Sequence, residues 1–321
     1  MKSTNRKVTI IGAGNVGATI AYTLAVESVA NEIVMIDIRA DKAAGEAMDI
    51  SQASPFFTGT RVVSGTYVDA ADSDIVIITS GMGRKPGQSR LDLAQNNVDI
   101  LCQIAPQITK YAPGAIYVIV SNPVDVMTYA FHKITDIPAN HIIGSGTLLD
   151  TSRLRSYLAE HFSISKQNIH AHVLGEHGDS SFIPWSQATV SAVSLQKYAE
   201  CVKDDVVIEP LDISRAERYV RSSGAEIIAR KGATFYAVAV ATVHICKCIF
   251  GDSDTALTLS TMLDGEYGLS DVCLSLLTVI GDRGIKARVP TDLNEEELEK
   301  LHQSAAALRN VIDQIHFPGK E

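Results

Sequence analysis

The sequence predicts an α/β protein in which a doubly wound parallel sheet is followed by a mixed α+β half. In the first half, short apolar runs alternate with helical patterns, and the runs are apolar throughout rather than at every second residue. Such strands are buried on both faces, as in a parallel sheet that helices cover on two sides. After about residue 145 this alternation stops, which indicates a second unit.

The elements of the first half follow from these patterns. We expect strands within residues 7–14, 32–37, 61–66, 74–81, 115–123 and 141–146. We expect helices over residues 15–29, 41–53 and 91–111. This order is typical of a doubly wound domain, which we place at residues 1–144.

The second half, residues 145–321, has a different pattern. We expect a helix over 150–162, a long helix through 214–250, a strand pair around 272–289 and a final helix over 294–316. Asn294, followed by acidic residues, is a favourable start for that last helix. The second half is therefore predicted to be an α+β domain.

Composition excludes several classes of protein. The net charge of −9 over 321 residues argues against a nucleic acid or an acidic membrane as the main partner. Five cysteines show no repeating spacing, and the pair Cys246 and Cys248 has no further ligand nearby, so we expect no metal. Glycines interrupt the apolar stretch near the N-terminus, and no other apolar run reaches the roughly 18 residues of a membrane span. We expect a cytoplasmic protein.

The stretch GAGNVG, residues 12–17, is a G-x-G-x-x-G motif between a predicted strand and a predicted helix. Gly12, Gly14 and Gly17 permit a tight turn, the approach of a pyrophosphate to backbone N–H groups, and close packing of the helix on the strand. Asp37 lies 20 residues beyond Gly17, at the end of the next strand. A carboxylate there accepts the ribose hydroxyls of NAD and repels the 2′-phosphate of NADP. The sequence therefore predicts a Rossmann domain that binds NAD.

The stretch GEHGDS places His177 on a loop between glycines and acids. A catalytic histidine needs an orienting carboxylate, and a small anionic substrate needs an anchor. Asp150 and Arg153, three residues apart at the start of a helix, share one face and are candidates for these two roles. A structural histidine beside a surface ion pair explains the same residues, and the pattern alone leaves both interpretations open.

The stretch SGMGRKPGQSRLDL, residues 80–93, places Arg84, Lys85 and Arg90 on a glycine-containing loop. One interpretation is a solvated basic loop. The other is a lid that closes over an anion, with the glycines allowing it to fold down.

The motifs GAGNVG, SNPVD, LDTSRLR, GEHGDS and KGATFYA occur together in the order and spacing of the L-lactate and malate dehydrogenase family. The sequence resembles that family over essentially its whole length, and its bacterial lactate members most. The resemblance implies that His177 exchanges a proton with the substrate, that Asp150 is its partner and that Arg153 anchors the substrate carboxylate. It implies that Asn122 positions substrate and nicotinamide, and that Arg90 polarises the substrate carbonyl.

The resemblance implies further roles. Residues Val16 and Gly81 join the NAD site, Thr234 joins the substrate site, and the second domain is the substrate-binding catalytic domain. Arg155 and His170 match positions that bind fructose 1,6-bisphosphate at a subunit interface in allosteric bacterial members, which implies a possible effector and a homotetramer.

Arg84 stands six residues before Arg90, where malate enzymes of this family typically carry arginine and lactate enzymes glutamine. We therefore expect an NAD-dependent dehydrogenase of L-malate and oxaloacetate. The alternative is L-lactate and pyruvate, because Glu176 and Thr234 are the residues of lactate enzymes. A silent NAD-binding sensor is the non-enzyme alternative, but it predicts loss of His177 or one of its partners, and all are present.

Overall fold

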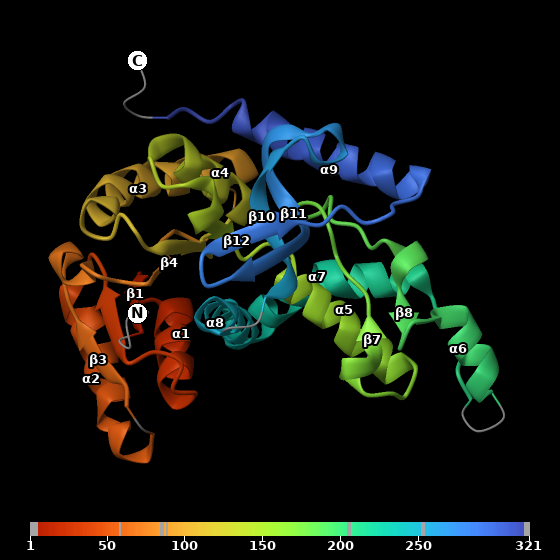
Figure 1. Ribbon diagram of the computed structural model, residues 1–321, viewed down its shortest axis with the longest axis horizontal. Coiled ribbons are helices and arrows are strands. Elements are labelled where there is room, and N and C mark those ends of the chain that lie inside the picture. Colours follow the sequence, from red (N-terminus) through yellow and green to blue (C-terminus); the bar gives the residue numbers. More distant parts are fainter. Residues whose placement is uncertain are drawn as a thin grey trace.

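The structure is a computed structural model and describes residues 6–57, 59–83, 87, 89–203, 207–251 and 254–317. A single sheet of nine strands runs through these residues in the order β12-β11-β10-β6-β5-β4-β1-β2-β3 (Figure 1). A second, three-stranded sheet joins β7, β8 and β9. The first half of the chain forms one end of the large sheet, and the second half forms the other.

The first half is the predicted doubly wound parallel domain. Its strands are β1 (Lys7–Ile11), β2 (Glu32–Ile36), β3 (Arg61–Ser64), β4 (Ile75–Ile78), β5 (Ile116–Ile119) and β6 (Ile142–Gly144). Every pairing among them is parallel, in the order 3-2-1-4-5-6. This confirms the predicted Rossmann arrangement.

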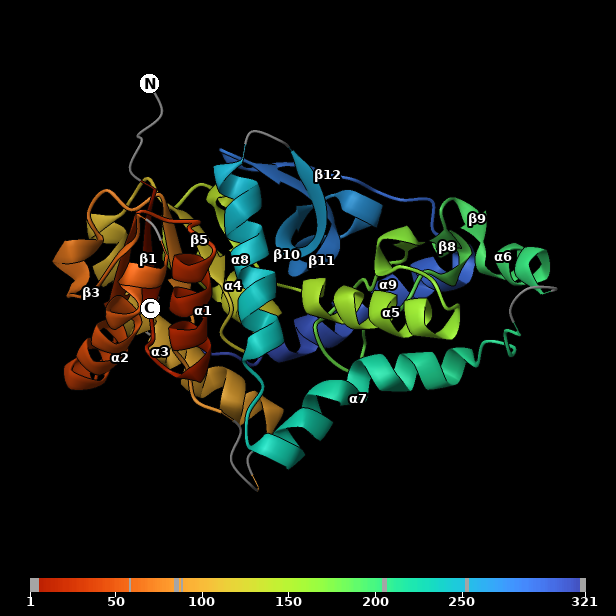
Figure 2. The ribbon, with the colours of Figure 1, turned by 90° about the horizontal axis from the view of Figure 1, so that it is seen from below.

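Helices cover both faces of these strands because successive strand residues point in opposite directions. The helices are α1 (Asn15–Val26), α2 (Ala40–Gln52), α3 (Arg90–Tyr111) and α4 (Val124–Ile134). Ile11, Ile78 and Ile119 belong to the core beneath α3 and α4, whereas their neighbours Ile10 and Ile77 belong to the core beneath α1 and α2. Figure 1 shows α3 above and α1 below the strands β1 and β4, and Figure 2 views the same strands from the α1 side. Two apolar cores thus bury both faces of the sheet beneath the helices.

The second half extends the same sheet with the antiparallel strands β10 (Thr255–Asp264), β11 (Ser270–Gly281) and β12 (Gly284–Arg288). Strand β10 joins β6 through the pair Ser260 and Gly144. The predicted strand pair corresponds to β11 and β12, but the prediction omitted β10. The sheet therefore continues past residue 144, and the proposed boundary there stays a prediction.

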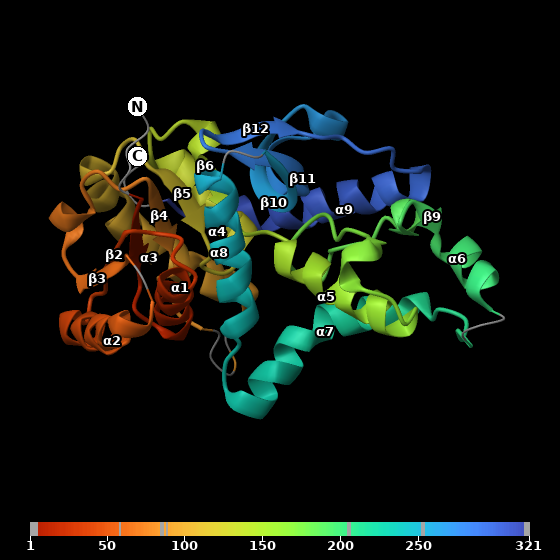
Figure 3. The same cartoon turned by 60° about the horizontal axis from the view of Figure 1, so that its bottom comes forward.

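The remaining elements pack around these strands. They are α5 (Leu148–His161), β7 (Ile169–His170), β8 (Thr189–Val190), β9 (Val193–Ser194), α6 (Leu195–Val202), α7 (Ile213–Lys231), α8 (Tyr236–Phe250) and α9 (Glu295–Ile312). Helix α8 lies between α1 and α5, and α7 lies along α5 (Figure 3). Asn294 caps α9 as predicted, accepting a hydrogen bond from the Glu297 N–H (2.9 Å).

The predicted single helix over 214–250 was wrong, because the chain forms two helices, α7 and α8. Gly232 ends α7 in the left-handed conformation (φ 84°), and its N–H donates to the Ile228 carbonyl (2.7 Å). Glycine adopts this conformation without steric cost, so it is a common residue after a helix C-terminus. The break turns the chain and brings α8 against the first domain.

The glycine turn after β1 has one crowded and one open position. A Cβ on Gly17 would lie 1.9 Å from the Gly12 carbonyl oxygen, so the first turn of α1 packs directly on the turn. A Cβ on Gly14 would meet nothing within 4 Å. The motif therefore has a packing glycine at 17 and a glycine at 14 that leaves space above the helix N-terminus.

We expect Gly17→Ala to lower the free energy of unfolding by about 3 kcal/mol or more, because its methyl group has no room and must displace backbone. Gly14→Ala is the matched control, expected to change stability by less than about 1 kcal/mol. Urea denaturation of the three proteins measures the difference. Equal stability of Gly17→Ala and wild type would contradict the close packing.

Candidate active site

The loops at the carboxyl ends of β1, β4 and β5 are hydrogen-bonded into one surface. The Ser80 hydroxyl, after β4, donates to the Ile11 carbonyl at the end of β1 (2.9 Å). The Ser121 hydroxyl, after β5, donates to the Ser80 carbonyl (2.6 Å). Ligands of doubly wound sheets bind at this edge, where the strand order reverses.

The Asp37 carboxylate lies beside the glycine turn. It accepts hydrogen bonds from the N–H groups of Ala13 (2.7 Å) and Arg39 (2.9 Å), which fix it at the end of β2. No side chain caps the N-terminus of α1, where Gly14 is the N-cap residue. The free N–H groups of that helix end and the open space at Gly14 fit a pyrophosphate, and Asp37 fits a ribose diol. Val16 is half-buried in the first turn of the same helix.

Asn97 is a site residue that sequence reasoning missed. It is buried on α3, and its side-chain oxygen accepts from the Met82 N–H (2.7 Å), while its amide donates to the Asn122 carbonyl (2.6 Å). A Cβ on Gly81 would lie 3.3 Å from the same oxygen. Asn97 thus holds the start of the basic loop against Asn122, whose own side chain is exposed at the end of β5. A polar residue on the apolar face of α3 was the available signal.

The structure brings His177, Asp150 and Arg153 together. The imidazole Nδ1 of His177 lies 2.6 Å from Asp150 Oδ2, and Arg153 Nη1 lies 2.8 Å from Asp150 Oδ1. Asp150 is 6% exposed, and the Arg153 side chain 14%. The Asp150–Arg153 pair is therefore not a solvated surface pair, and its carboxylate bonds two groups at once.

The charges of this cluster shift the pKa values of its members. The negative charge of Asp150 raises the pKa of His177 to about 9, against the opposing effect of burial. Burial favours a raised pKa for Asp150, but His177 and Arg153 outweigh it and lower that pKa. At neutral pH the histidine therefore carries a proton and the aspartate does not, which suits a proton donor.

Asp125, in the SNPVD motif, is a second residue whose part sequence reasoning missed. It is buried on α4, and its Oδ2 accepts a hydrogen bond from the backbone N–H of His177 (2.8 Å). Burial raises the pKa of Asp125 to about 6, with Ser260 and His177 opposing the rise. This hydrogen bond connects α4 of the first domain to the histidine loop. The sequence signal that could have identified Asp125 was a single acidic residue within an apolar stretch.

Arg90 lies beside the histidine loop but contacts Asp179 there. It is the first residue of α3, a position fixed by Ser89, whose hydroxyl accepts from the Asp92 N–H (3.0 Å). Its guanidinium forms an ion pair with Asp179, two residues after His177. The two side chains are 58% and 75% exposed, respectively. The structure thus places Arg90 at the edge of the site rather than over it.

Of the other residues of the predicted substrate site and basic loop, the structure describes Thr234 but not Arg84 or Lys85. Thr234 is half-buried in the connection between α7 and α8. Arg84 and Lys85 lie outside the residues that the structure describes. Arg84, the residue on which the malate prediction rests, therefore has no structural account here.

Arg155 and His170 lie in a second cationic cluster. The Arg155 Nε donates to the Ala171 carbonyl (3.0 Å), and burial lowers the pKa of Arg155. His170 is exposed at the end of β7. The pKa of His172 is lowered to about 4, mainly by burial and to a smaller extent by the charges of Arg155 and His170. Among the residues described, no group of His, Cys, Asp and Glu could hold a metal ion.

A Rossmann sheet with an acid after β2, joined to a domain that supplies a His–Asp pair and an arginine, defines a class of NAD-dependent oxidoreductases. Residues 6–144 match the NAD-binding domain of lactate/malate dehydrogenase, and residues 147–317 match its alpha/beta C-terminal domain. The chain belongs to the lactate/malate dehydrogenase family and uses NAD. No helix in the described ranges has both the length and the apolar character to cross a membrane.

Named relatives match along nearly the whole chain. The L-lactate dehydrogenase of Acetivibrio thermocellus is 42% identical over 308 residues, 96% of each chain. L-lactate dehydrogenase 1 of Clostridium acetobutylicum is 42% identical over 313 residues, 97% of this chain and 99% of the relative. The crystal structure of the minor L-lactate dehydrogenase of Enterococcus mundtii, in a ligands-bound form, superposes with a TM-score of 0.92 at 36% identity, covering 98% of this chain and 99% of that one.

We expect Asp150→Asn to lower the pKa of His177 from about 9 toward the ordinary histidine value of about 6.5, because the charge that holds the proton is gone. NMR titration of the His177 ring measures this pKa. Asp179→Asn is the control, because it removes a charge near His177 that does not contact the ring. The raised pKa also stabilises the fold fully below about pH 6.5, and this contribution is lost as the pH rises through about 9. A His177 pKa unchanged in Asp150→Asn would contradict the pairing.

Proposed function

We propose that the chain catalyses the reversible, NAD-linked interconversion of L-lactate and pyruvate. The observation that carries the chemistry is the His177–Asp150–Arg153 cluster, a proton donor and a carboxylate anchor held by one buried aspartate. The choice of lactate and pyruvate is supported by relatives named L-lactate dehydrogenase, which match along nearly the whole chain. It is also supported by Glu176 and Thr234, the residues that lactate enzymes carry at these positions.

His177 exchanges the proton. NAD, when bound, supplies or accepts the hydride. The imidazole Nδ1 is engaged by Asp150, so Nε2 is the nitrogen that faces substrate and donates its proton to the oxygen of the keto acid. Asp150 keeps the ring in one orientation and stabilises its charged form. Oxidation of the hydroxy acid needs the neutral ring, so its rate rises with pH toward about 9.

Arg153 holds the substrate carboxylate. Asp150 accepts a hydrogen bond from its Nη1, and no other described residue bonds the guanidinium, so its remaining N–H groups can form two parallel bonds to a carboxylate. A Cβ on Gly224 would lie 3.6 Å from Nη2, so α7 borders this anchor closely. Because one carboxylate orients both His177 and Arg153, proton donor and anchor keep a fixed separation.

Arg90 stabilises the charge that develops on the substrate oxygen. To reach it, the guanidinium exchanges Asp179 for substrate as the loop closes. Exposed ion pairs are worth about 0–1 kcal/mol, so this exchange costs little.

L-Malate and oxaloacetate form the second candidate pair, which Arg84 favours. A guanidinium in the closed site would pair with the second carboxylate of oxaloacetate, worth roughly 1.5–3 kcal/mol. With pyruvate, closure would leave that charge buried and unpaired, at a cost of about 2–5 kcal/mol, unless the side chain turns to solvent. The lactate proposal therefore requires Arg84 to point out of the site.

The two candidates differ in the ratio of kcat/KM for pyruvate to kcat/KM for oxaloacetate. We expect the wild-type ratio to exceed about 10, and Arg84→Gln to raise it by a further tenfold or more by removing the group that attracts the second carboxylate. Lys85→Gln is the matched control and should leave the ratio unchanged. A wild-type preference for oxaloacetate would overturn the lactate proposal and support the malate one.

We also infer an effector site for fructose 1,6-bisphosphate at Arg155 and His170, in a homotetramer. Arg155 supplies a cation there and His170 an exposed imidazole, and two copies facing across a two-fold axis would form a self-complementary bisphosphate site. We expect the bisphosphate to lower the KM for the keto acid severalfold in wild type and not in Arg155→Gln, with Lys197→Gln as the control. Saturation curves with and without bisphosphate measure the effect. Identical wild-type curves would reject it.

A further inference from the structure

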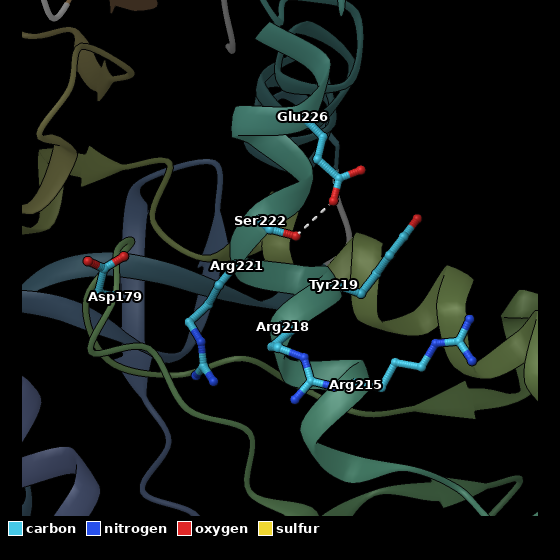
Figure 4. Close-up of a pocket in the computed structure, with 7 residues that line it drawn as sticks. All are labelled: Asp179, Arg215, Arg218, Tyr219, Arg221, Ser222 and Glu226. Carbon is cyan, nitrogen blue, oxygen red and sulfur yellow. Dashed lines mark hydrogen bonds between the residues drawn. The ribbon is translucent and has the colours of Figure 1, made fainter. Parts of the chain in front are cut away.

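An open groove of about 650 Å³ follows the outer face of α7 and borders the histidine loop (Figure 4). Its lining residues are Asp179, Arg215, Arg218, Tyr219, Arg221, Ser222 and Glu226. All but Asp179 come from α7, and its three arginines are spaced three residues apart, so they lie on successive turns. Asp179 faces the helix from the loop after His177.

The charges of the groove are unequally compensated. Arg221 donates to the Ser181 carbonyl (3.1 Å) and pairs with Glu217 (3.1 Å). Glu226 accepts from the Ser222 hydroxyl (3.1 Å) and lies 4.0 Å from Arg230.

Asp179, the remaining acid of the groove, is paired with Arg90. Arg215 and Arg218 differ from Arg221: both are exposed, and neither has an ion pair with any residue that the structure describes. Among the described residues, the groove therefore holds two guanidinium groups that have no ion-pair partner.

Two neighbouring cations on one helix face repel each other, and they do so here in a protein of net charge −9. A bound oxyanion relieves that repulsion, and the planar N–H donors of arginine match phosphate and carboxylate oxygens. A monovalent anion would gain little at an exposed site, whereas an anion that meets both guanidinium groups gains from each. We propose that this groove binds a small oxyanion with two or more negative charges, a phosphate or a polycarboxylate.

The groove suits a small anion rather than an extended one. Asp179 lies level with Arg221, and Glu226 lies farther along α7, away from Arg215 and Arg218, so a long polyanion that ran from these two arginines along the helix would meet negative charge. The groove contains none of the proposed anchor and effector residues, because the partly buried Arg153 and Arg155 lie on α5 and His170 lies on β7.

Isothermal titration calorimetry at low ionic strength tests the proposal, with inorganic phosphate and citrate as separate probes. We expect at least one of them to bind wild type with a Kd of about 1 mM or below. The double variant Arg215→Gln/Arg218→Gln should raise that Kd at least tenfold. Lys110→Gln/Lys197→Gln, which removes the same charge elsewhere on the surface, should change it less than twofold.

Three results would overturn the proposal. These are no heat from either probe at about 10 mM in wild type, equal binding by the Arg215→Gln/Arg218→Gln variant, and equal loss in the matched surface variant. If binding disappears in Arg155→Gln and persists in the groove variant, the anion occupies the proposed effector site and the groove proposal fails. Because the replaced arginines are exposed, thermal melting should show all variants folded.

Discussion

The active site depends on one buried carboxylate that two cations share. Asp150 meets the His177 imidazole through one oxygen and the Arg153 guanidinium through the other. A buried charge is costly without partners, and loss of one partner typically costs 3–5 kcal/mol, so the three groups hold each other in place. The same interaction sets the proton on His177 and aims Arg153. Acid–base chemistry and substrate anchoring are therefore not independent properties of this fold.

The backbone around His177 is fixed from both halves of the chain. Asp125, on α4, accepts its N–H, while Gly175 exchanges two hydrogen bonds with Ser275 of β11 (3.0 and 2.9 Å). Gly175 has φ 88°, and a Cβ there would lie 2.7 Å from the Ser304 hydroxyl, so only glycine fits this turn readily. The histidine loop is thus hydrogen-bonded both to α4 of the parallel domain and to β11 of the antiparallel extension. Domain packing positions the chemistry.

The sequence was sufficient wherever a local pattern had a single physical meaning. Continuous apolar runs indicated β1 to β6, and the glycine motif with Asp37 indicated NAD. It failed where long-range packing decided, because β10 depends on contacts with α4 and β6. The break at Gly232 had a local signal, a glycine directly after two basic residues, which the continuous helical pattern hid. Asn97 and Asp125 were overlooked because a buried polar group becomes informative only once its partners are known. Arg84 raises a question of substrate that its position in the chain alone does not answer.

Asp150 and Asp179 show how burial divides two identical side chains between opposite tasks. Both pair with a cation at the site, but the side chain of Asp150 is 8% exposed and that of Asp179 is 75% exposed. Water can replace the Arg90 partner of Asp179 at little cost, whereas nothing can replace the partners of Asp150. The exposed pair is therefore free to exchange as the loop moves, and the buried pair is not. A site that must open for each turnover needs an ion pair that can exchange its partner and another that cannot. Solvent exposure, not residue type, decides which aspartate forms which pair.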